Sequence, residues 1–195
     1  MDPLLAVDAS LRAEADRLLA SGLRDALEAF GTVHLMGSYT LKLMVWRDLD
    51  IHIVQPQITA REFFELGGRI AEAVHPAKMH YRNELVMQST GLPRGLYWGV
   101  YLGDERKGAW KIDVWMTDEA GFAAPHDFQE RVRHALTDER RHTILRIKSA
   151  VWTHPEYRRG FSSADIYRAV IDDGVREVDE FLSARRVDDA RSNSR

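Results

Sequence analysis

The stretch MGSYTLKLMVWRDLDIHIV, residues 36–54, ends in a predicted strand that carries two aspartates two positions apart. Polar and apolar residues alternate there, which predicts a β-strand whose apolar side chains face a core while Asp48, Asp50 and His52 share the opposite face. Residues two apart on a strand have Cα atoms roughly 7 Å apart, and like charges on one face repel each other. We expect such a chain to form a sheet with one covered face, and the two carboxylates cost stability unless something positive lies between them.

A second segment, AWKIDVWM at residues 109–116, repeats the pattern. Its apolar residues predict a core-facing side, and Lys111, Asp113 and Trp115 face the other way. If the two strands are neighbours in the sheet, three carboxylates meet on one patch. Oxygen ligands of this kind suit Mg²⁺, and three carboxylates can hold two ions about 3.5–4 Å apart for in-line displacement at phosphorus. The sequence therefore predicts a two-metal site for phosphoryl chemistry.

Gly37 and Ser38 follow a short predicted strand, TVHLM at residues 32–36, and open a turn of helix over residues 39–44. A strand that ends in Gly-Ser before a helix presents unpaired backbone N–H groups and a hydroxyl, and both can hold an anion. Taken alone, the pair is more simply a helix N-cap. Next to the carboxylates it predicts a phosphate-binding turn.

The remaining pattern predicts an α/β (α+β) fold, in which a small mixed sheet is backed by helices and followed by a C-terminal helical region. Further helices are predicted over residues 8–30, 59–74, 126–137, 138–152 and 162–183, and further strands over residues 47–54, 78–88 and 96–102, with GDERKG as a hairpin turn. We expect a core with its N-terminal helix over residues 1–120, the helical region over 121–186 and a frayed polar tail over 187–195.

Composition excludes several classes of protein. The 195 residues include no cysteine, which rules out disulfides, thiolate zinc sites and cysteine nucleophiles. Thirty acidic residues against 27 basic ones give a net charge of −3, which argues against a dedicated nucleic-acid-binding protein. The sequence contains no long apolar run of the kind that predicts a membrane span or a signal peptide. We therefore expect a soluble, cytoplasmic protein.

The order of these motifs resembles the polymerase-β-like nucleotidyltransferases, including small bacterial members that modify antibiotics. Their pattern is Gly-Ser, a gap of about ten residues, Asp-x-Asp in an apolar strand, and a third carboxylate on a later strand. Here Gly37-Ser38 is followed by Asp48-x-Asp50 and, on the later strand, by Asp113. The resemblance implies a nucleotidyltransferase core with a helical C-terminal part.

The resemblance covers roughly residues 30–118. It implies transfer of a nucleoside monophosphate, with AMP from ATP favoured, to an acceptor hydroxyl with release of pyrophosphate. By the same resemblance, the three aspartates bind two Mg²⁺ ions and the Gly-Ser pair holds the β- and γ-phosphates. Asp113 would also help to deprotonate the acceptor hydroxyl.

Two positions depart from the family pattern. Lys42 stands where many members have a second glycine, and Arg47 stands where many have Ser or Thr; both are candidate phosphate contacts. Lys148 is a candidate triphosphate contact from the helical part, because resembling enzymes often use a helical lysine there. Glu84 is a candidate general base on the acceptor, and its alternative is an ion pair with Arg82.

Each motif also has a plainer interpretation. The Asp-x-Asp pair fits a solvated edge strand, and Asp113 alone fits a buried ion pair. For the whole chain, two alternatives to transfer onto a small-molecule hydroxyl stay open: a toxin-like transferase acting on tRNA or protein, and a nucleotide-binding module without catalysis. The net charge favours a small, cationic acceptor over RNA. A homodimer stays open, and no membrane partner is expected.

Overall fold

The computed structural model describes the backbone of residues 2–192 and the side chains of residues 2–185. The chain forms a mixed α/β structure with one five-stranded sheet, in the order β1-β2-β5-β4-β3. The strands are β1 (Thr32–Met36), β2 (Asp48–Val54), β3 (Lys78–Asn83), β4 (Gly95–Tyr101) and β5 (Lys111–Thr117). β2 and β5 pair in parallel at the centre, and the other neighbouring strands are antiparallel. The expected small mixed sheet is confirmed.

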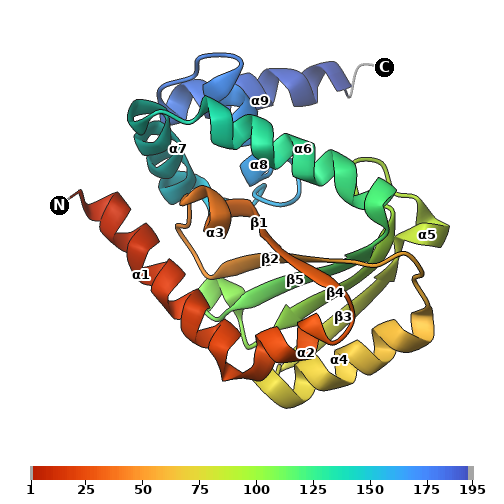
Figure 1. The fold of residues 1–195 in the computed structure, drawn as a ribbon. Coiled ribbons are helices and arrows are strands. Elements are labelled where there is room, and N and C mark those ends of the chain that lie inside the picture. Colours follow the sequence, from red (N-terminus) through yellow and green to blue (C-terminus); the bar gives the residue numbers. More distant parts are fainter. Residues whose placement is uncertain (1, 193–195) are drawn as a thin grey trace.

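Helices cover both sides of this sheet. The α-helices are α1 (Pro3–Leu18), α2 (Arg24–Glu28), α3 (Gly37–Leu41), α4 (Ala60–Val74), α5 (Glu84–Met87), α6 (Glu119–Ala135), α7 (Asp138–Val151), α8 (Ser163–Ile171) and α9 (Val178–Ser192). A π-helical turn, η1 (Leu19–Leu23), joins α1 to α2, and a 3₁₀ turn, η2 (Glu105–Lys107), joins β4 to β5. α2 and α4 lie along one face of the sheet, whereas α6, α7 and α8 gather on the opposite side (Figure 1).

The main core lies between the sheet and α4. Leu49 and Ile51 of β2 and Val114 of β5 are fully buried there, against Phe63 and Leu66 of α4. Each such side chain contributes about 1.5–3 kcal/mol by leaving water. This packing fixes which face of each central strand is turned inward, and it leaves the acidic residues on the other face.

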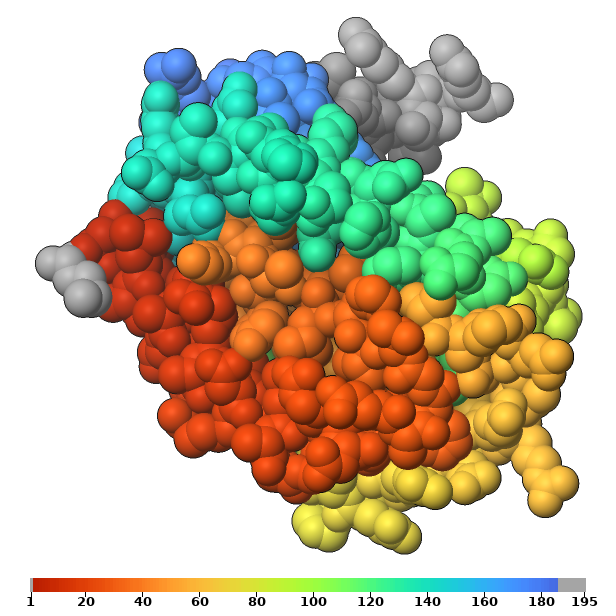
Figure 2. All heavy atoms as spheres, in the orientation of Figure 1, coloured from red at the N-terminus to blue at the C-terminus, as the bar shows by residue number. Residues whose placement is uncertain are grey.

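A second apolar cluster joins the C-terminal helices to the connection between α3 and β2. Leu43 and Trp46 from that connection pack in the same cluster as Ile144 and Ile147 of α7 and Phe181 of α9. In the space-filling view the teal C-terminal helices lie directly against the orange segment around α3 (Figure 2). The helical region therefore shares a core with the strand-bearing part, and residue 120 falls within α6.

Two predicted elements differ in extent. The helix expected over residues 8–30 begins at Pro3 and is interrupted at Gly22, whose φ of 101° is outside the helical range. The strand expected over residues 78–88 ends at Asn83, because the Asn83 side chain accepts a hydrogen bond from the backbone N–H of Leu85 and caps α5.

The C-terminal helices also begin and end at other residues than expected. α6 starts before Pro125, since Asp118 caps it through the backbone N–H of Gly121 at 2.7 Å. The helix expected over residues 162–183 is divided into α8 and α9 near Gly174, which has a φ of 72°. The expected tail is helical as far as Ser192, and residues 193–195 lie outside the described part. No helix within residues 2–192 is both long and apolar enough to cross a lipid bilayer.

Candidate active site

The pairing of β2 with β5 brings the predicted carboxylates together. Asp50 lies directly opposite Asp113 in the parallel register, and Asp48 lies opposite Lys111. Asp48, Asp50 and Asp113 all line one cleft of about 230 Å³. The condition set by the sequence, that the two strands be neighbours, is therefore met.

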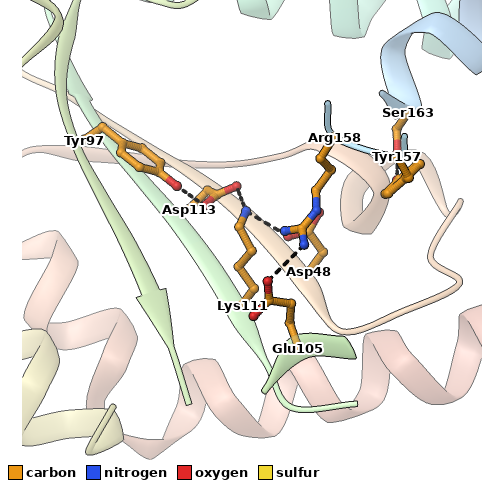
Figure 3. A network of polar contacts seen from close by, with 8 residues as sticks. All are labelled: Asp48, Tyr97, Glu105, Lys111, Asp113, Tyr157, Arg158 and Ser163. Carbon is orange, nitrogen blue, oxygen red and sulfur yellow. Dashed lines mark hydrogen bonds and ion pairs between the residues drawn. The ribbon is translucent and has the colours of Figure 1, made fainter. Parts of the chain in front are cut away.

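The cleft has one wall from the sheet and one from the C-terminal helices. Its lining consists of Gly37, Ser38, Asp48, Asp50, Lys111 and Asp113 on the first side, and of Phe128, Tyr157, Arg158, Ser162, Ser163, Ala164 and Tyr167 on the second. Figure 3 shows the polar contacts around this space, on the sheet side among Lys111, Asp48, Asp113 and Tyr97 and on the other side between Tyr157 and Ser163. A ligand in the cleft meets carboxylates on one side and hydroxyl and guanidinium groups on the other.

Lys111 supplies the cation that two of the carboxylates require. Its ammonium forms an ion pair with Asp113 and lies 3.5 Å from Asp48 Oδ1, while only 8% of its side chain is exposed. Burial acts to lower the pKa of Lys111, but Asp48 and Asp113 outweigh burial and hold that pKa well above its ordinary value. The other oxygen of Asp113 accepts a hydrogen bond from the Tyr97 hydroxyl of β4 at 2.6 Å. Asp113 is thus held on both sides.

Asp50 is the carboxylate that has no such partner. Within the described residues its side chain makes no hydrogen bond or ion pair. Burial, together with the nearby charges of Asp48 and Asp113, raises the pKa of Asp50 to about 8. With no cation of the described residues beside it, Asp50 is the carboxylate of the cleft that is left for a bound cation.

Gly37 and Ser38 lie beside Asp50 where β1 passes into α3. Gly37 has a φ of 63°, and a Cβ atom there would lie 2.0 Å from Asp50 Oδ2, so only glycine fits. The sequence suggested that the backbone N–H of Gly37 is free. In the structure this N–H donates to Gln129 Oε1 of α6 at 2.7 Å. The Ser38 side chain is buried, lines the cleft and has no hydrogen-bond partner among the described residues. Ser38 is therefore the donor that this turn offers to an anion.

Arg158 faces the carboxylates from the C-terminal wall, and sequence reasoning did not find it. Its guanidinium donates to Glu105 Oε1 at 3.0 Å (Figure 3), and it also stacks over Trp46 at 4.9 Å. Burial acts to lower the pKa of Arg158, yet the bond to Glu105 and the charge of Asp48 raise it above its ordinary value. Nearby, the hydroxyls of Tyr157 and Ser163 lie 2.6 Å apart. No site motif marks Arg158 in the sequence, so only the fold shows that it lines the cleft.

Arg47 and Lys42 do not line the cleft. Arg47 forms an ion pair with Glu14 of α1, with its Nε 2.6 Å from a carboxylate oxygen, and it also donates to the Gly108 carbonyl at 3.0 Å. Lys42 is exposed and ends α3 in a left-handed conformation with a φ of 58°. Arg47 therefore ties β2 to α1 and to the turn before β5, and Lys42 occupies the position at which many helices end in glycine.

Lys148 lies behind the cleft wall. It is fully buried, and its ammonium donates to the Leu43 carbonyl at 2.7 Å and to the Tyr167 hydroxyl at 3.1 Å. Burial lowers the pKa of Lys148 to about 8, against the opposing influence of Asp48 and Asp50. Lys148 thus supports Tyr167, which does line the cleft, and does not itself reach it.

Glu84 lies outside the cleft, at the end of β3. Its side chain is 1% exposed, accepts from the backbone N–H of Ser89 at 2.9 Å and pairs with Arg82 at 2.5 Å. The hydrogen bond from Ser89 lowers the pKa of Glu84, and burial acts to raise it. The charge of Arg82 adds to the effect of Ser89, and the pKa is lowered on balance. The ion pair with Arg82, which the sequence left open as the alternative, is the arrangement that the structure has.

The donor set of the cleft fits Mg²⁺. This ion takes one or two carboxylates and completes its shell with waters and phosphate oxygens, so Asp48 and Asp50 are sufficient protein ligands. As the side chains lie here, with Lys111 between Asp48 and Asp113, no three Asp, Glu or His residues of the described chain are arranged as ligands of one ion. The unpartnered Asp50 carboxylate is the observation that supports the fit.

Comparisons of the chain with protein-family models and with curated proteins find no match.

Proposed function

We propose that this protein is a Mg²⁺-dependent nucleotidyltransferase that moves a nucleoside monophosphate from an NTP, with ATP as the expected donor, to an acceptor hydroxyl. The observation that carries the proposal is the cleft in which Asp48, Asp50 and Asp113 meet beside the free hydroxyl of Ser38. Carboxylates for a metal and a hydroxyl for a phosphate are the groups that this reaction needs on one side of the nucleotide.

In this reaction the acceptor oxygen forms a bond to the α-phosphorus, and the bond from that phosphorus to the bridging oxygen breaks. The electron pair leaves with pyrophosphate. When bound, Mg²⁺ would neutralise negative charge on the α-phosphate and the leaving group. Asp48 and Asp50 would hold the metal, and Ser38 would donate to a phosphate oxygen. Asp113, which lies on the neighbouring strand, is the base that we assign to the acceptor proton.

The cationic side chains in this proposal differ from those expected from sequence. Arg158 and Lys111 line the cleft and would contact the triphosphate in this proposal, whereas Lys42, Arg47 and Lys148 do not line the cleft. A guanidinium group suits phosphate, because its planar donors match two oxygens at once. Glu84 has no part in this mechanism.

Calorimetric titration of ATP, GTP, CTP and UTP, with and without Mg²⁺, tests the proposal. We expect wild-type protein to bind one or more of these nucleotides only with Mg²⁺, and the variant with Asp48→Asn and Asp50→Asn together to bind at least about tenfold more weakly. Asp127→Asn is the matched control, since the Asp127 side chain is 82% exposed outside the cleft. If the control binds as wild type does but so does the double variant, the proposed site is wrong.

One observation favours the second candidate, a nucleotide-binding module without catalysis. Lys111 already places a cation of the protein between two of the three carboxylates, as a site that works without metal would require. The same titration separates the two functions, because nucleotide binding that is equal with and without Mg²⁺ supports the module and contradicts the transferase.

A further inference from the structure

A second, larger groove, which we call the side groove, adjoins the carboxylate cleft. It has a volume of about 510 Å³ and runs between the loop at residues 91–94, the exposed side of α6 and the start of α8. Phe128 and Ala164 line both the groove and the cleft. A molecule lying in the side groove can therefore extend one end past these two residues, toward Asp113, Asp48 and Asp50 of the cleft.

The lining of the side groove has a distinct chemical character. None of the described residues that line it is Asp or Glu, and most are Gly, Ala, Leu, Pro or Phe. The two charged residues are Arg94 and Arg168. An apolar surface with cationic groups binds apolar molecules that carry a negative charge, and it is unfavourable for polycations.

The guanidinium of Arg94 is available to a ligand, and that of Arg168 has further N–H donors beside its bond to Asp165. Arg94 is exposed, and its side chain makes no hydrogen bond or ion pair with a described residue. Arg168 is half exposed, pairs with Asp165 only at 3.4 Å and packs over the Phe128 ring at 4.8 Å. The stacking on Phe128 holds one positive charge against the apolar wall.

The loop that carries Arg94 is fixed to α6. A Cβ atom at Gly121 would lie 2.4 Å from the Arg94 carbonyl oxygen, so the two backbones approach more closely than any other residue would allow. The N–H of Gly121 is bound by Asp118, which caps the same helix. The distance between the two sides of the side groove is therefore set by backbone packing.

We propose that the side groove is the acceptor site of the transferase, and that the acceptor is a small hydroxyl compound with an apolar body and an anionic group, such as a carboxylate. This inference rests on the proposed function. The anionic group would lie at Arg94 and Arg168, and the hydroxyl would reach the carboxylate cleft past Phe128. The acceptor loses its hydroxyl proton and gains the nucleotidyl group, as described above. The local charge thus reverses the expectation, drawn from net charge, of a cationic acceptor.

Three probes that share a phenyl ring and a butyl chain test this site: phenylbutyrate, phenylbutanol and phenylbutylamine, titrated by ligand-observed NMR. We expect phenylbutyrate to bind wild-type protein at least about fivefold more tightly than phenylbutylamine, the effect of about one ion pair. Arg94→Gln should remove most of this preference and Arg94→Glu should reverse it. Equal binding of the acid and the amine, or no binding of any probe, would overturn the proposal.

A steric pair of variants locates the binding. Ala124 is exposed and lines the side groove, whereas its neighbour Ala123 is exposed and does not. Ala124→Trp should abolish binding of all three probes and leave Mg²⁺-dependent ATP binding unchanged, while Ala123→Trp should bind both as wild type does. If Ala124→Trp weakens ATP instead of the probes, the side groove holds the nucleotide base and the proposal is wrong.

Failure of this inference is distinguishable from failure of the proposed function. Wild-type protein that binds phenylbutyrate in the side groove but binds no nucleotide with Mg²⁺ would keep the anion-binding groove and overturn its role as an acceptor site. Mg²⁺-dependent nucleotide binding without probe binding would keep the transferase and overturn the side groove.

Discussion

At the scale of single residues, one carboxyl group of the cleft has no cation of the described residues beside it. Lys111 contacts Asp113 and Asp48, and Asp50 is left without a partner in the described residues. Uncompensated charge in a partly buried site lowers stability and is retained where a ligand uses it.

Asp50→Asn should stabilise the protein in the absence of metal. The folded pKa of Asp50, about 8, lies above its unfolded value of 3.8, so its contribution to stability is full below pH 4 and is lost as pH rises through 8. Removing the charge should raise the free energy of unfolding at pH 8 by about 2 kcal/mol, a value reduced for solvent screening, and the gain should disappear near pH 4. Urea denaturation at pH 4, 6 and 8 in EDTA measures this. A variant less stable than wild type at pH 8 would contradict it.

Lys111→Met should have the opposite effect. The substitution leaves Asp48 and Asp113 without their shared cation in a site where Lys111 is only 8% exposed. We expect a loss of about 3 kcal/mol at pH 8, because breaking one side of a buried pair leaves a buried charge. Lys107→Met is the control, since the Lys107 side chain is 85% exposed. A loss no larger than that of the control would show that Lys111 is not the required cation.

Residue positions near the strands were predictable, and positions set by distant contacts were not. The period of two placed Asp48, Asp50 and Asp113 on the correct faces, because alternation is a local property of a strand. Arg158 reaches the cleft only through the packing of the C-terminal helices, and it stacks on Trp46, more than a hundred positions earlier. Arg47 was placed near phosphate by motif position, but its partner Glu14 lies on a helix whose docking no local pattern shows.

At the scale of elements, the turn from β1 into α3 determines where Asp50 lies. Gly37 packs against the Asp50 carboxylate, and its N–H is bound by Gln129 of α6. The turn thus joins the sheet, α3 and α6 at one point. The sequence indicated a Gly-Ser turn there, but it could not show that α6 occupies one of its N–H groups.

Gly37→Ala should lower the free energy of unfolding far more than Gly174→Ala, although both glycines have a positive φ. Gly37 and Gly174 have φ values of 63° and 72°, so both substitutions carry a conformational cost of about 1 kcal/mol. Only at Gly37 does the new Cβ meet another group, the Asp50 oxygen at 2.0 Å; Gly174 has nothing within 4 Å. We expect Gly37→Ala to lose at least about 2 kcal/mol more than Gly174→Ala by chemical denaturation. Equal losses would mean that the contact with Asp50 has no energetic importance.

The same scale explains why the sequence misjudged some elements. Residues 84–88 continue an apolar pattern after β3, yet Asn83 caps a helical turn there. Glu84 forms an ion pair with Arg82 and accepts a hydrogen bond from the backbone N–H of Ser89. Side-chain caps of this kind override a weak strand preference. The sequence could not predict that β2 pairs with β5, because strand order depends on contacts between distant segments. The prediction of a shared carboxylate site was therefore conditional on that pairing.

At the scale of the whole molecule, the candidate site lies where two apolar clusters meet. The sheet and α4 form one cluster, and the C-terminal helices form the other with the connection from α3 to β2. Each contributes one wall of the cleft, and the side groove extends it along α6 and α8. The net charge of the chain could not predict the charge of either wall, because one wall is acidic and the other carries Arg158.

The location of a metal ion tests the central claim most directly. Crystals grown with Mn²⁺ and a non-hydrolysable ATP analogue would give an anomalous signal at each bound metal. We predict a peak within coordination distance, about 2–2.3 Å, of carboxylate oxygens of both Asp48 and Asp50, with the phosphates beside Ser38. A nucleotide bound with its metal away from these two aspartates, or no metal peak in the cleft at saturating Mn²⁺ and nucleotide, would contradict the account.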